Sequence, residues 1–197
     1  MHKNQFKNSI INMRIPSILA TAFLSIFLFS CKSENKEQDQ KDVVTVEKPQ
    51  INDELFTITI NAVVEKDDSF QVYYKDAEKD AFVEEKSLYN VFKGSNQAQD
   101  IQFVLPENAL PNYLRFDFGI NKEQSEVVIN SIKIDYLGEN FTIKNNELDL
   151  FISFNDQTLK FNKEKGSIAP FVAKDGSYDP MSFTGQTLYD KIQIFKQ

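Results

Sequence analysis

Apolar and polar residues alternate along the chain from Leu55 onward. The alternation is clearest over residues 56–64 and returns over residues 70–74. Because successive side chains of a β-strand point to opposite faces, a period of two predicts strands that are buried on one face. The polar residues 66–68 separate these two runs and predict a hairpin turn.

Shorter runs of the same kind continue along the chain, separated by turn-forming residues. The runs are 88–92, 101–105, 114–118, 141–143, 148–154, 159–161 and 192–194. Many short strands joined by turns predict an all-β fold, an antiparallel β-sandwich over residues 51–197. Residues 174–185 are rich in turn formers and predict a loop before the closing strand. No segment keeps a helical period for three turns.

One change of register can be recognised in residues 127–136. The apolar positions Val127 and Ile129 have one parity, and the apolar positions from Ile132 onward have the other. A β-bulge near Asn130-Ser131 would place both sets on the core face. The alternative is a strand whose start is buried on both faces, with Val127 and Val128 both inside.

The N-terminal segment has a different pattern, an apolar run over residues 15–29 that ends close to the only cysteine, Cys31. Basic residues and no acidic ones precede this run, and the small Ser30 comes immediately before Cys31. A basic start, an apolar centre and a small residue at the cleavage position predict a signal peptide over residues 1–30. Met13 is an alternative start for the same signal.

The ending Leu28-Phe29-Ser30-Cys31 resembles the lipobox of bacterial lipoproteins, in which the cysteine is acylated and becomes the new N-terminus. The resemblance implies a protein of the cell envelope, held at the outer membrane by palmitate-type chains on Cys31. The alternative is a transmembrane anchor. The run 15–29 is, however, shorter than the roughly 20 apolar residues that a spanning helix needs.

Residues 31–50 are almost entirely polar and contain no aromatic residue. Such a segment buries too little apolar surface to offset the entropy of ordering it, so it predicts a flexible tether. Lys32, Glu34 and Glu37 resemble the surface-export signal that follows the lipidated cysteine in Bacteroidota-type bacteria. A solvated linker without any signal is the alternative.

The net charge limits the kinds of partner. It is −7 for the whole sequence, and removal of the basic signal peptide makes the remaining chain more acidic. Proteins bind nucleic acids and anionic headgroups chiefly through Lys and Arg. We therefore expect no nucleic-acid partner, and membrane contact through the N-terminal lipid.

The side chains that are absent limit the chemistry. The single histidine, His2, lies in the predicted signal peptide, and Cys31 would be consumed by acylation. This leaves no residues for Ser-His-Asp or Cys-His catalysis, for a His or Cys zinc site, or for a disulfide. Catalysis would be restricted to carboxylates, so we expect that the protein is not an enzyme. We also expect no cofactor and no metal site.

Residues 101–138 are the most distinctive segment of the predicted domain. They contain Leu105-Pro106, followed by residues 114–119 (LRFDFG) and then by residues 127–136 (VVINSIKIDY). This order of motifs resembles that of galactose-binding-like domains. These domains include modules of bacterial glycan-handling membrane proteins. The resemblance implies a jelly-roll-like arrangement of the sandwich and an architecture that binds sugars.

The predicted ligand site lies in this segment. Leu114, Phe116 and Phe118 should face the core, which places Arg115 and Asp117 together on the other face of the strand. In the resembled family an arginine on the sandwich helps to bind ligand hydroxyls, and its planar donors suit paired acceptors. The alternative is a structural ion pair of Arg115 with Asp117. Because the chain has no Trp, a sugar would stack on tyrosine; the candidates are Tyr73, Tyr89 and Tyr113, with Tyr113 nearest to Arg115 in sequence.

Two acidic segments are weaker candidates. Calcium binds six to eight oxygens, and the acidic residues at 76, 78 and 80 or at 175 and 179 could supply some of them. Neither segment matches an EF-hand loop, so solvated turns are the favoured interpretation. Tyr178 and Asp179 also form a second candidate binding site, because loops at the ends of sandwiches often carry function.

These observations favour a non-catalytic binding module at the cell envelope, with a glycan as the ligand. The alternative is a structural or assembly lipoprotein whose sandwich contacts another envelope protein through an apolar face or a sheet edge.

Overall fold

The computed structural model describes residues 54–197 of the chain. The predicted signal peptide, the acylation site Cys31 and the tether over 31–50 lie outside these residues. Within the described part, no helix has both the length and the apolar character needed to cross a membrane.

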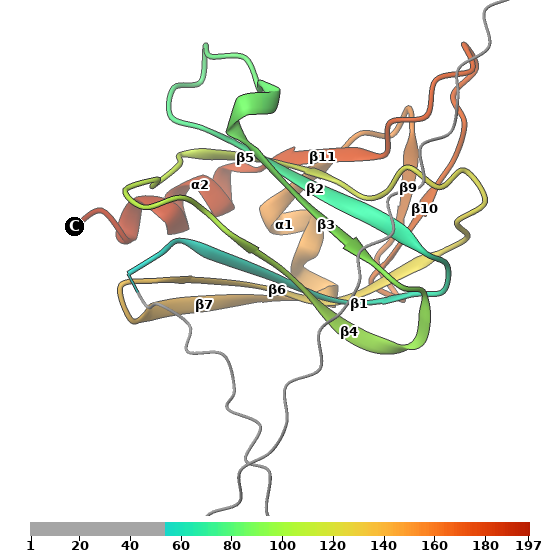
Figure 1. Cartoon of the computed structure of the whole chain (residues 1–197), viewed down its shortest axis with the longest axis horizontal. Helices are drawn as coiled ribbons and strands as arrows, with labels where there is room; N and C mark the ends of the chain where they lie inside the picture. Colours follow the sequence, from blue (N-terminus) through green and yellow to red (C-terminus); the bar gives the residue numbers. More distant parts are fainter. Residues whose placement is uncertain (1–53) are drawn as a thin grey trace, which may run out of the picture. The chain divides into compact units, whose positions relative to one another are not determined.

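The strands form two antiparallel sheets, which confirms the predicted all-β sandwich (Figure 1). The six-stranded sheet has the order β4 (Ser95–Val104), β1 (Thr57–Val64), β6 (Val127–Tyr136), β10 (Ser167–Pro170) and β9 (Leu159–Asn162), and β7 (Glu139–Lys144) also pairs with β6. The five-stranded sheet has the order β3 (Ser87–Phe92), β2 (Asp68–Lys75), β5 (Tyr113–Asp117), β11 (Met181–Thr184) and β8 (Ile152–Phe154).

The core lies between the sheets and is rich in phenylalanine. Phe56, Ile58 and Ile60 on one sheet, and Phe70 and Phe116 on the other, are completely or almost completely buried. Burial of one such side chain contributes roughly 1.5–3 kcal/mol. The predicted inward positions of β1 and β5 are therefore confirmed, and the alternate residues of both strands are only partly buried, apart from Thr57, which is buried.

The predicted hairpin at residues 66–68 is wrong. β1 belongs to the six-stranded sheet and β2 to the five-stranded sheet, so the connection passes from one layer to the other. β1 pairs with β4 and β6 instead. A short polar connection suits a crossing between layers as well as a hairpin, and the sequence does not distinguish the two.

The predicted β-bulge in β6 is confirmed. Asn61 of β1 pairs with Ser131, whereas the next residue, Ala62, pairs with Ile129, so Asn130 is the extra residue. Val127 and Ile129 before the bulge and Ile132 and Ile134 after it are all fully buried, and Tyr136 at the end of the strand is partly buried. Val128 is only partly buried, which disagrees with the alternative of a strand start buried on both faces.

The C-terminal region departs from the prediction. Residues 192–194 belong to the helix α2 (Gln186–Ile194) rather than to a closing strand, and Leu148–Phe151 forms the short helix α1. Met181–Thr184, predicted as part of a loop, is the strand β11 between β5 and β8. Two short 3-10 helices, η1 (Glu84–Lys86) and η2 (Asn145–Glu147), complete the described elements.

Candidate functional site

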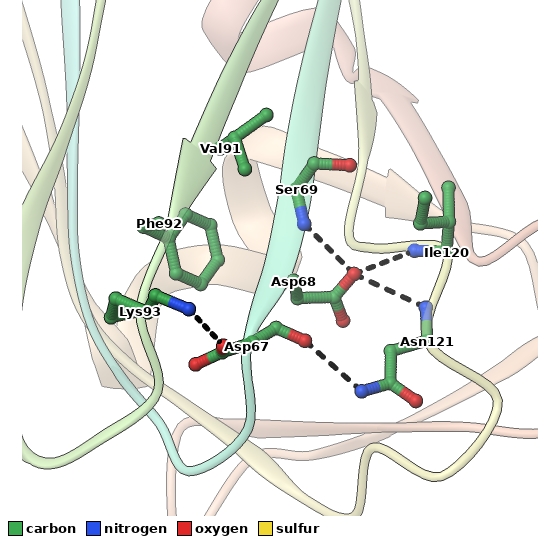
Figure 2. A pocket seen from close by; sticks show the side chains of 8 residues that line it. All are labelled: Asp67, Asp68, Ser69, Val91, Phe92, Lys93, Ile120 and Asn121. Carbon is green, nitrogen blue, oxygen red and sulfur yellow. Dashed lines mark hydrogen bonds and ion pairs between the residues drawn. The ribbon is translucent and has the colours of Figure 1, made fainter.

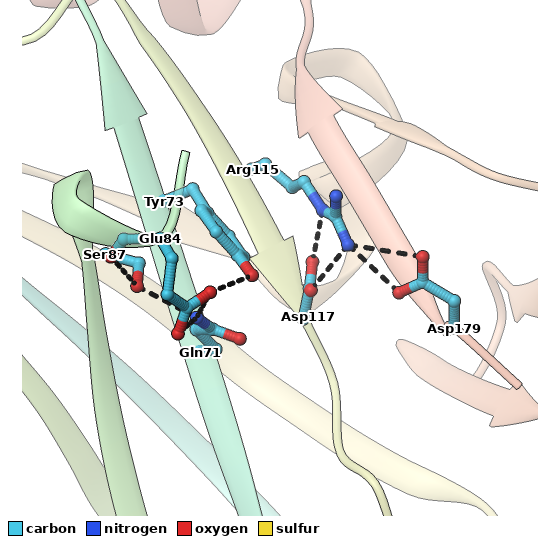
Figure 3. Close-up of polar contacts among 7 residues, drawn as sticks. All are labelled: Gln71, Tyr73, Glu84, Ser87, Arg115, Asp117 and Asp179. Carbon is cyan, nitrogen blue, oxygen red and sulfur yellow. Dashed lines mark hydrogen bonds and ion pairs between the residues drawn. The ribbon is translucent and has the colours of Figure 1, made fainter. Parts of the chain in front are cut away.

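The outer face of the five-stranded sheet carries a cluster of polar and aromatic side chains, which we call the Arg115 cluster. It consists of Gln71, Tyr73, Glu84, Arg115, Asp117 and Asp179 (Figure 3). Strand pairing builds it, because Tyr73 lies opposite Arg115 and Gln71 lies opposite Asp117 on neighbouring strands. Their common face follows from the alternation in β2 and β5 that buries Val72 and Phe116.

Arg115 is at the centre of the cluster. Its Nε and Nη2 donate to the two carboxylate oxygens of Asp117, each at 2.7 Å. Nη2 also donates to Asp179 at 3.0 and 3.2 Å, and the guanidinium lies 4.9 Å from the centre of the Tyr73 ring. Nη1 donates to no residue in the described range 54–197. The predicted ion pair therefore exists, and it leaves one guanidinium nitrogen able to donate to a ligand.

Asp117 is the most deeply placed acidic group of the cluster. Burial raises the pKa of Asp117 to about 6, although its hydrogen bond to Arg115 acts in the opposite direction. The carboxylates of Asp179 and Glu84 raise the pKa of Asp117 further, because like charges nearby disfavour ionisation. One guanidinium thus faces three carboxyl groups, and the cluster has an excess of negative charge.

Glu84 covers the side of the cluster formed by β2. The 3-10 helix η1 places its carboxylate 2.9 Å from the Tyr73 hydroxyl and 3.2 Å from Nε2 of Gln71, which both donate to it. The Tyr73 hydrogen bond holds the pKa of Glu84 below its ordinary value. Burial together with Glu84 raises the pKa of Tyr73 to about 12, so this hydroxyl stays protonated as a donor.

The three tyrosine candidates lie in different places. Tyr73 contacts Arg115, whereas Tyr113, the one nearest in sequence, packs against Tyr189 of α2 at 5.2 Å and lies 5.4 Å from the Lys75 ammonium. Tyr89, on the edge strand β3, lies opposite Gln71 and is 58% exposed. Tyr89 is therefore the candidate with an accessible ring beside the cluster.

The second candidate site is divided by the structure. Asp179 joins the Arg115 cluster, whereas the Tyr178 hydroxyl donates to the backbone carbonyl of Asn121. Asp175 accepts hydrogen bonds from Ser177, as in a local turn. Within residues 54–197, no group of three or more acidic, His or Cys side chains could hold a metal ion.

Two members of the cluster had no signal in the sequence. Gln71 lies in an alternating strand with no motif around it, and Glu84 lies in a connection of many acidic residues. Only the pairing of β2 with β5, and the path of the connection that leads to η1, bring them to Arg115. Non-local contacts of this kind leave no periodic trace in a single sequence.

Comparison with known proteins gave no assignment. No protein-family model, no curated protein and no solved structure matches this chain. The interpretation of the site therefore rests on its geometry.

The cluster is rich in hydrogen-bonding groups. It offers a donor on Arg115, acceptors on Asp179 and Glu84, and an exposed aromatic residue, Tyr89. Paired donors and acceptors beside an aromatic ring suit a ligand with many hydroxyl groups and an apolar face.

Proposed function

We propose that this protein is a lipid-anchored protein of the cell envelope whose β-sandwich binds a glycan without catalysis. The observation that carries the proposal is the arrangement of Arg115 and Tyr89 on one sheet face. Arg115 has a guanidinium nitrogen that is not used within the described residues, and Tyr89 is 58% exposed.

The two groups match the two surfaces of a sugar. Neighbouring hydroxyls accept hydrogen bonds from a guanidinium, and Asp179 can accept hydrogen bonds in return. The C–H face of a sugar ring can stack on Tyr89. The resemblance of residues 101–138 to galactose-binding-like jelly rolls supports the same function, because this segment contains Arg115 and Asp117.

The charges of the cluster favour a neutral glycan. Asp117, Asp179 and Glu84 surround a single guanidinium, and the chain as a whole is acidic. A uronic acid or a sulfated sugar would bring a further negative charge close to these carboxylates. A neutral or amino sugar avoids this repulsion.

The state of the carboxyl groups supports binding rather than hydrolysis. A glycosidase needs two carboxyl groups free to act on either side of the scissile bond. Asp117 is held by both of its oxygens to Arg115, and Asp179 is shared with the same guanidinium. Glu84 is likewise engaged by Tyr73 and Gln71.

The proposal is tested with glycan arrays and calorimetry on wild-type protein and matched variants. Tyr89→Ala should reduce affinity about fivefold or more, since stacking contributes about 1 kcal/mol or more. Arg115→Lys should also weaken binding, because it keeps the charge and removes the planar fork. The control is Ile194→Ala, which removes an apolar side chain of equal exposure, 58%, from α2. An array that stays blank for neutral surface polysaccharides would reject the proposal.

A second function has one observation in its favour. β3 is an edge strand, and its Tyr89 and Val91 side chains are exposed on the same face. An apolar sheet edge of this kind suits a structural or assembly lipoprotein that contacts another envelope protein. Recovery of one stoichiometric partner that is lost in Tyr89→Ala, without glycan binding, would favour this function.

A further inference from the structure

A hollow of about 540 Å³ lies at the end of the five-stranded sheet, on the same face as the Arg115 cluster. Its lining comes from the start of β2, the end of β3 and the segment after β5 (Figure 2). The lining residues are Asp67, Asp68, Ser69, Val91, Phe92, Lys93, Ile120 and Asn121. The volume is within the range of sites for small ligands.

The strand register connects the hollow with the cluster. Ser69 pairs with Val91, and the next outward pair along the same strands is Gln71 with Tyr89. Two residues along a strand correspond to roughly 7 Å, so the hollow begins one outward row beyond Tyr89. From the row of Tyr73 to that of Ser69 the distance is roughly 13 Å. This is longer than a single sugar ring.

The walls of the hollow are apolar and its floor is polar. Val91 and Ile120 are 81% and 73% exposed, and Figure 2 shows Ser69 between them. The backbone N–H of Ser69 donates to Asp68, whereas its hydroxyl has no hydrogen-bond partner among residues 54–197, and the residue is 8% exposed. The Lys93 ammonium at the rim is paired with Asp67 at 2.6 Å. The hollow therefore combines apolar contact with the uncharged Ser69 hydroxyl, whereas the side-chain amide of Asn121 is already bonded to Asp67 and Glu123.

The floor of the hollow is preformed. One oxygen of the buried Asp68 carboxylate accepts the backbone N–H groups of Ser69, Ile120 and Asn121, at 2.9, 2.8 and 3.1 Å. These bonds tie the start of β2 to the segment after β5. The carboxylate is occupied within the fold and leaves the recognition to Ser69, Val91 and Ile120.

We propose that this hollow is a second subsite of the same glycan site and that it receives the acetamido group of an N-acetylated sugar. This inference rests on the proposed function. The methyl group would contact Val91 and Ile120, and the amide would hydrogen-bond the Ser69 hydroxyl. The ligand is then a neutral oligosaccharide that extends from the Arg115 cluster along β2 and β3, with an N-acetylated residue at the β3 end.

The test compares two β-1,4-linked tetrasaccharides of equal length, one of N-acetylglucosamine and one of glucose, by calorimetry. Wild-type protein should bind the acetylated ligand about tenfold more tightly, from one buried methyl group and one hydrogen bond. The double variant Val91→Ser/Ile120→Ser should lose the part of this preference that comes from the methyl group, about fourfold, and keep its affinity for the glucose ligand. Ile194→Ser serves as the control for removal of an exposed apolar side chain elsewhere, and it should keep the preference.

The outcomes separate the two proposals. Equal affinity of wild-type protein for the two ligands overturns the subsite and leaves glycan binding standing. A preference that is undiminished in the double variant also overturns the subsite. Absence of binding to either ligand, together with a blank array, overturns both proposals. Loss of a protein partner in the double variant, without any change in glycan affinity, assigns the hollow to protein contact and rejects the subsite.

Discussion

At Gly119 the backbone has a φ of +110°, and the residue lies directly against the Asp68 carboxylate. A Cβ at this position would overlap the carboxylate, and the positive φ would strain any other L-residue. We predict that Gly119→Ala lowers the free energy of unfolding by roughly 3 kcal/mol, from strain and from displacement of Asp68. Urea denaturation measures this change.

Gly138 provides the matched control for this prediction. It also has a positive φ, +79°, but a Cβ there would meet no atom within 4 Å. Gly138→Ala should therefore cost only the conformational strain, roughly 1 kcal/mol. Equal costs for the two substitutions would show that the contact with Asp68 does not matter for stability.

Asp117 should titrate near neutral pH. Its pKa is raised by burial to about 6, from 3.8 for an ordinary carboxyl group, so the folded state favours the protonated form. The corresponding stability is fully present below about pH 4 and is lost as the pH rises through about 6, by up to about 3 kcal/mol. Relative to Asp117→Asn, the wild-type protein should lose stability between pH 4 and pH 7.

Carbon NMR of the Asp117 carboxyl group measures the same property directly. The midpoint should lie near 6 and should fall in Asp179→Asn, because the substitution removes a neighbouring negative charge that raises the pKa of Asp117. A midpoint at or below 4 in the wild-type protein would contradict the predicted direction.

Part of the candidate site could be predicted at the level of single residues. A period of two around Leu114 and Phe116 is enough to place Arg115 and Asp117 on one outward face. It does not tell which tyrosine lies beside Arg115, since that depends on the register of β2 against β5. Proximity in sequence favoured Tyr113, whereas the register brings Tyr73.

Among the elements, β6 depends on one inserted residue. Deletion of Asn130 would shift the pairing by one position and turn Val127 and Ile129 from the core to the outside. We predict a loss of roughly 3–6 kcal/mol, the burial of two apolar side chains. Thermal and urea unfolding of the deletion variant measure it.

The substitution Asn130→Ala keeps the length of the strand and controls for the side chain. It removes an exposed hydrogen bond from Nδ2 of Asn130 to Asn61, 2.8 Å long. The expected cost is about 1 kcal/mol or less. A deletion that is no more harmful than this substitution would contradict the role of the bulge.

The stability costs of two substitutions in α2 distinguish the observed helix from a strand. In the helix, Leu188 and Ile192 are fully buried four residues apart, whereas Ile194 is exposed. Ile192→Ala should cost about 2–5 kcal/mol, and Ile194→Ala less than about 0.5 kcal/mol. A strand would place Ile192 and Ile194 on one face, so similar costs for both would favour a strand.

The C-terminal elements could not be predicted because their signals are short. α2 has nine residues, and its buried side chains Leu188 and Ile192 give only one helical interval. Ile192 and Ile194 together imitate the period of a strand. β11 has four residues between turn-forming segments, and it is a strand because β5 and β8 lie on either side of it.

For the whole molecule, the sequence was sufficient for the fold class and insufficient for the arrangement of strands. Alternation and turns indicate many short antiparallel strands, and they are present. The pairing of β1 with β4 and β6, and the passage of the chain from β1 to β2 between layers, depend on contacts between distant segments. Such contacts are determined by how two complete sheets fit together.

At the scale of the whole molecule, the proposed lipid anchor makes Cys31 the residue expected to decide where the protein is located. We predict that the protein incorporates labelled fatty acid and sediments with membranes, since several acyl chains give lasting membrane attachment. Cys31→Ala should abolish both properties, and Ser33→Ala, a change just beyond the lipobox, should leave both unaltered. Unchanged labelling in Cys31→Ala would contradict lipid attachment.

At the hollow at the end of the five-stranded sheet, the residues that hold the backbone differ from the residues that are exposed to a ligand. Asp68 lies against Gly119 and binds the backbone N–H groups of Ser69, Ile120 and Asn121, whereas the side chains of Ile120 and of Val91, on the neighbouring strand β3, are exposed. Substitutions of the two exposed side chains can therefore alter what the surface selects without weakening its support. Substitutions at Val91 and Ile120 are therefore a route by which evolution, or protein design, can change the ligand specificity of this surface.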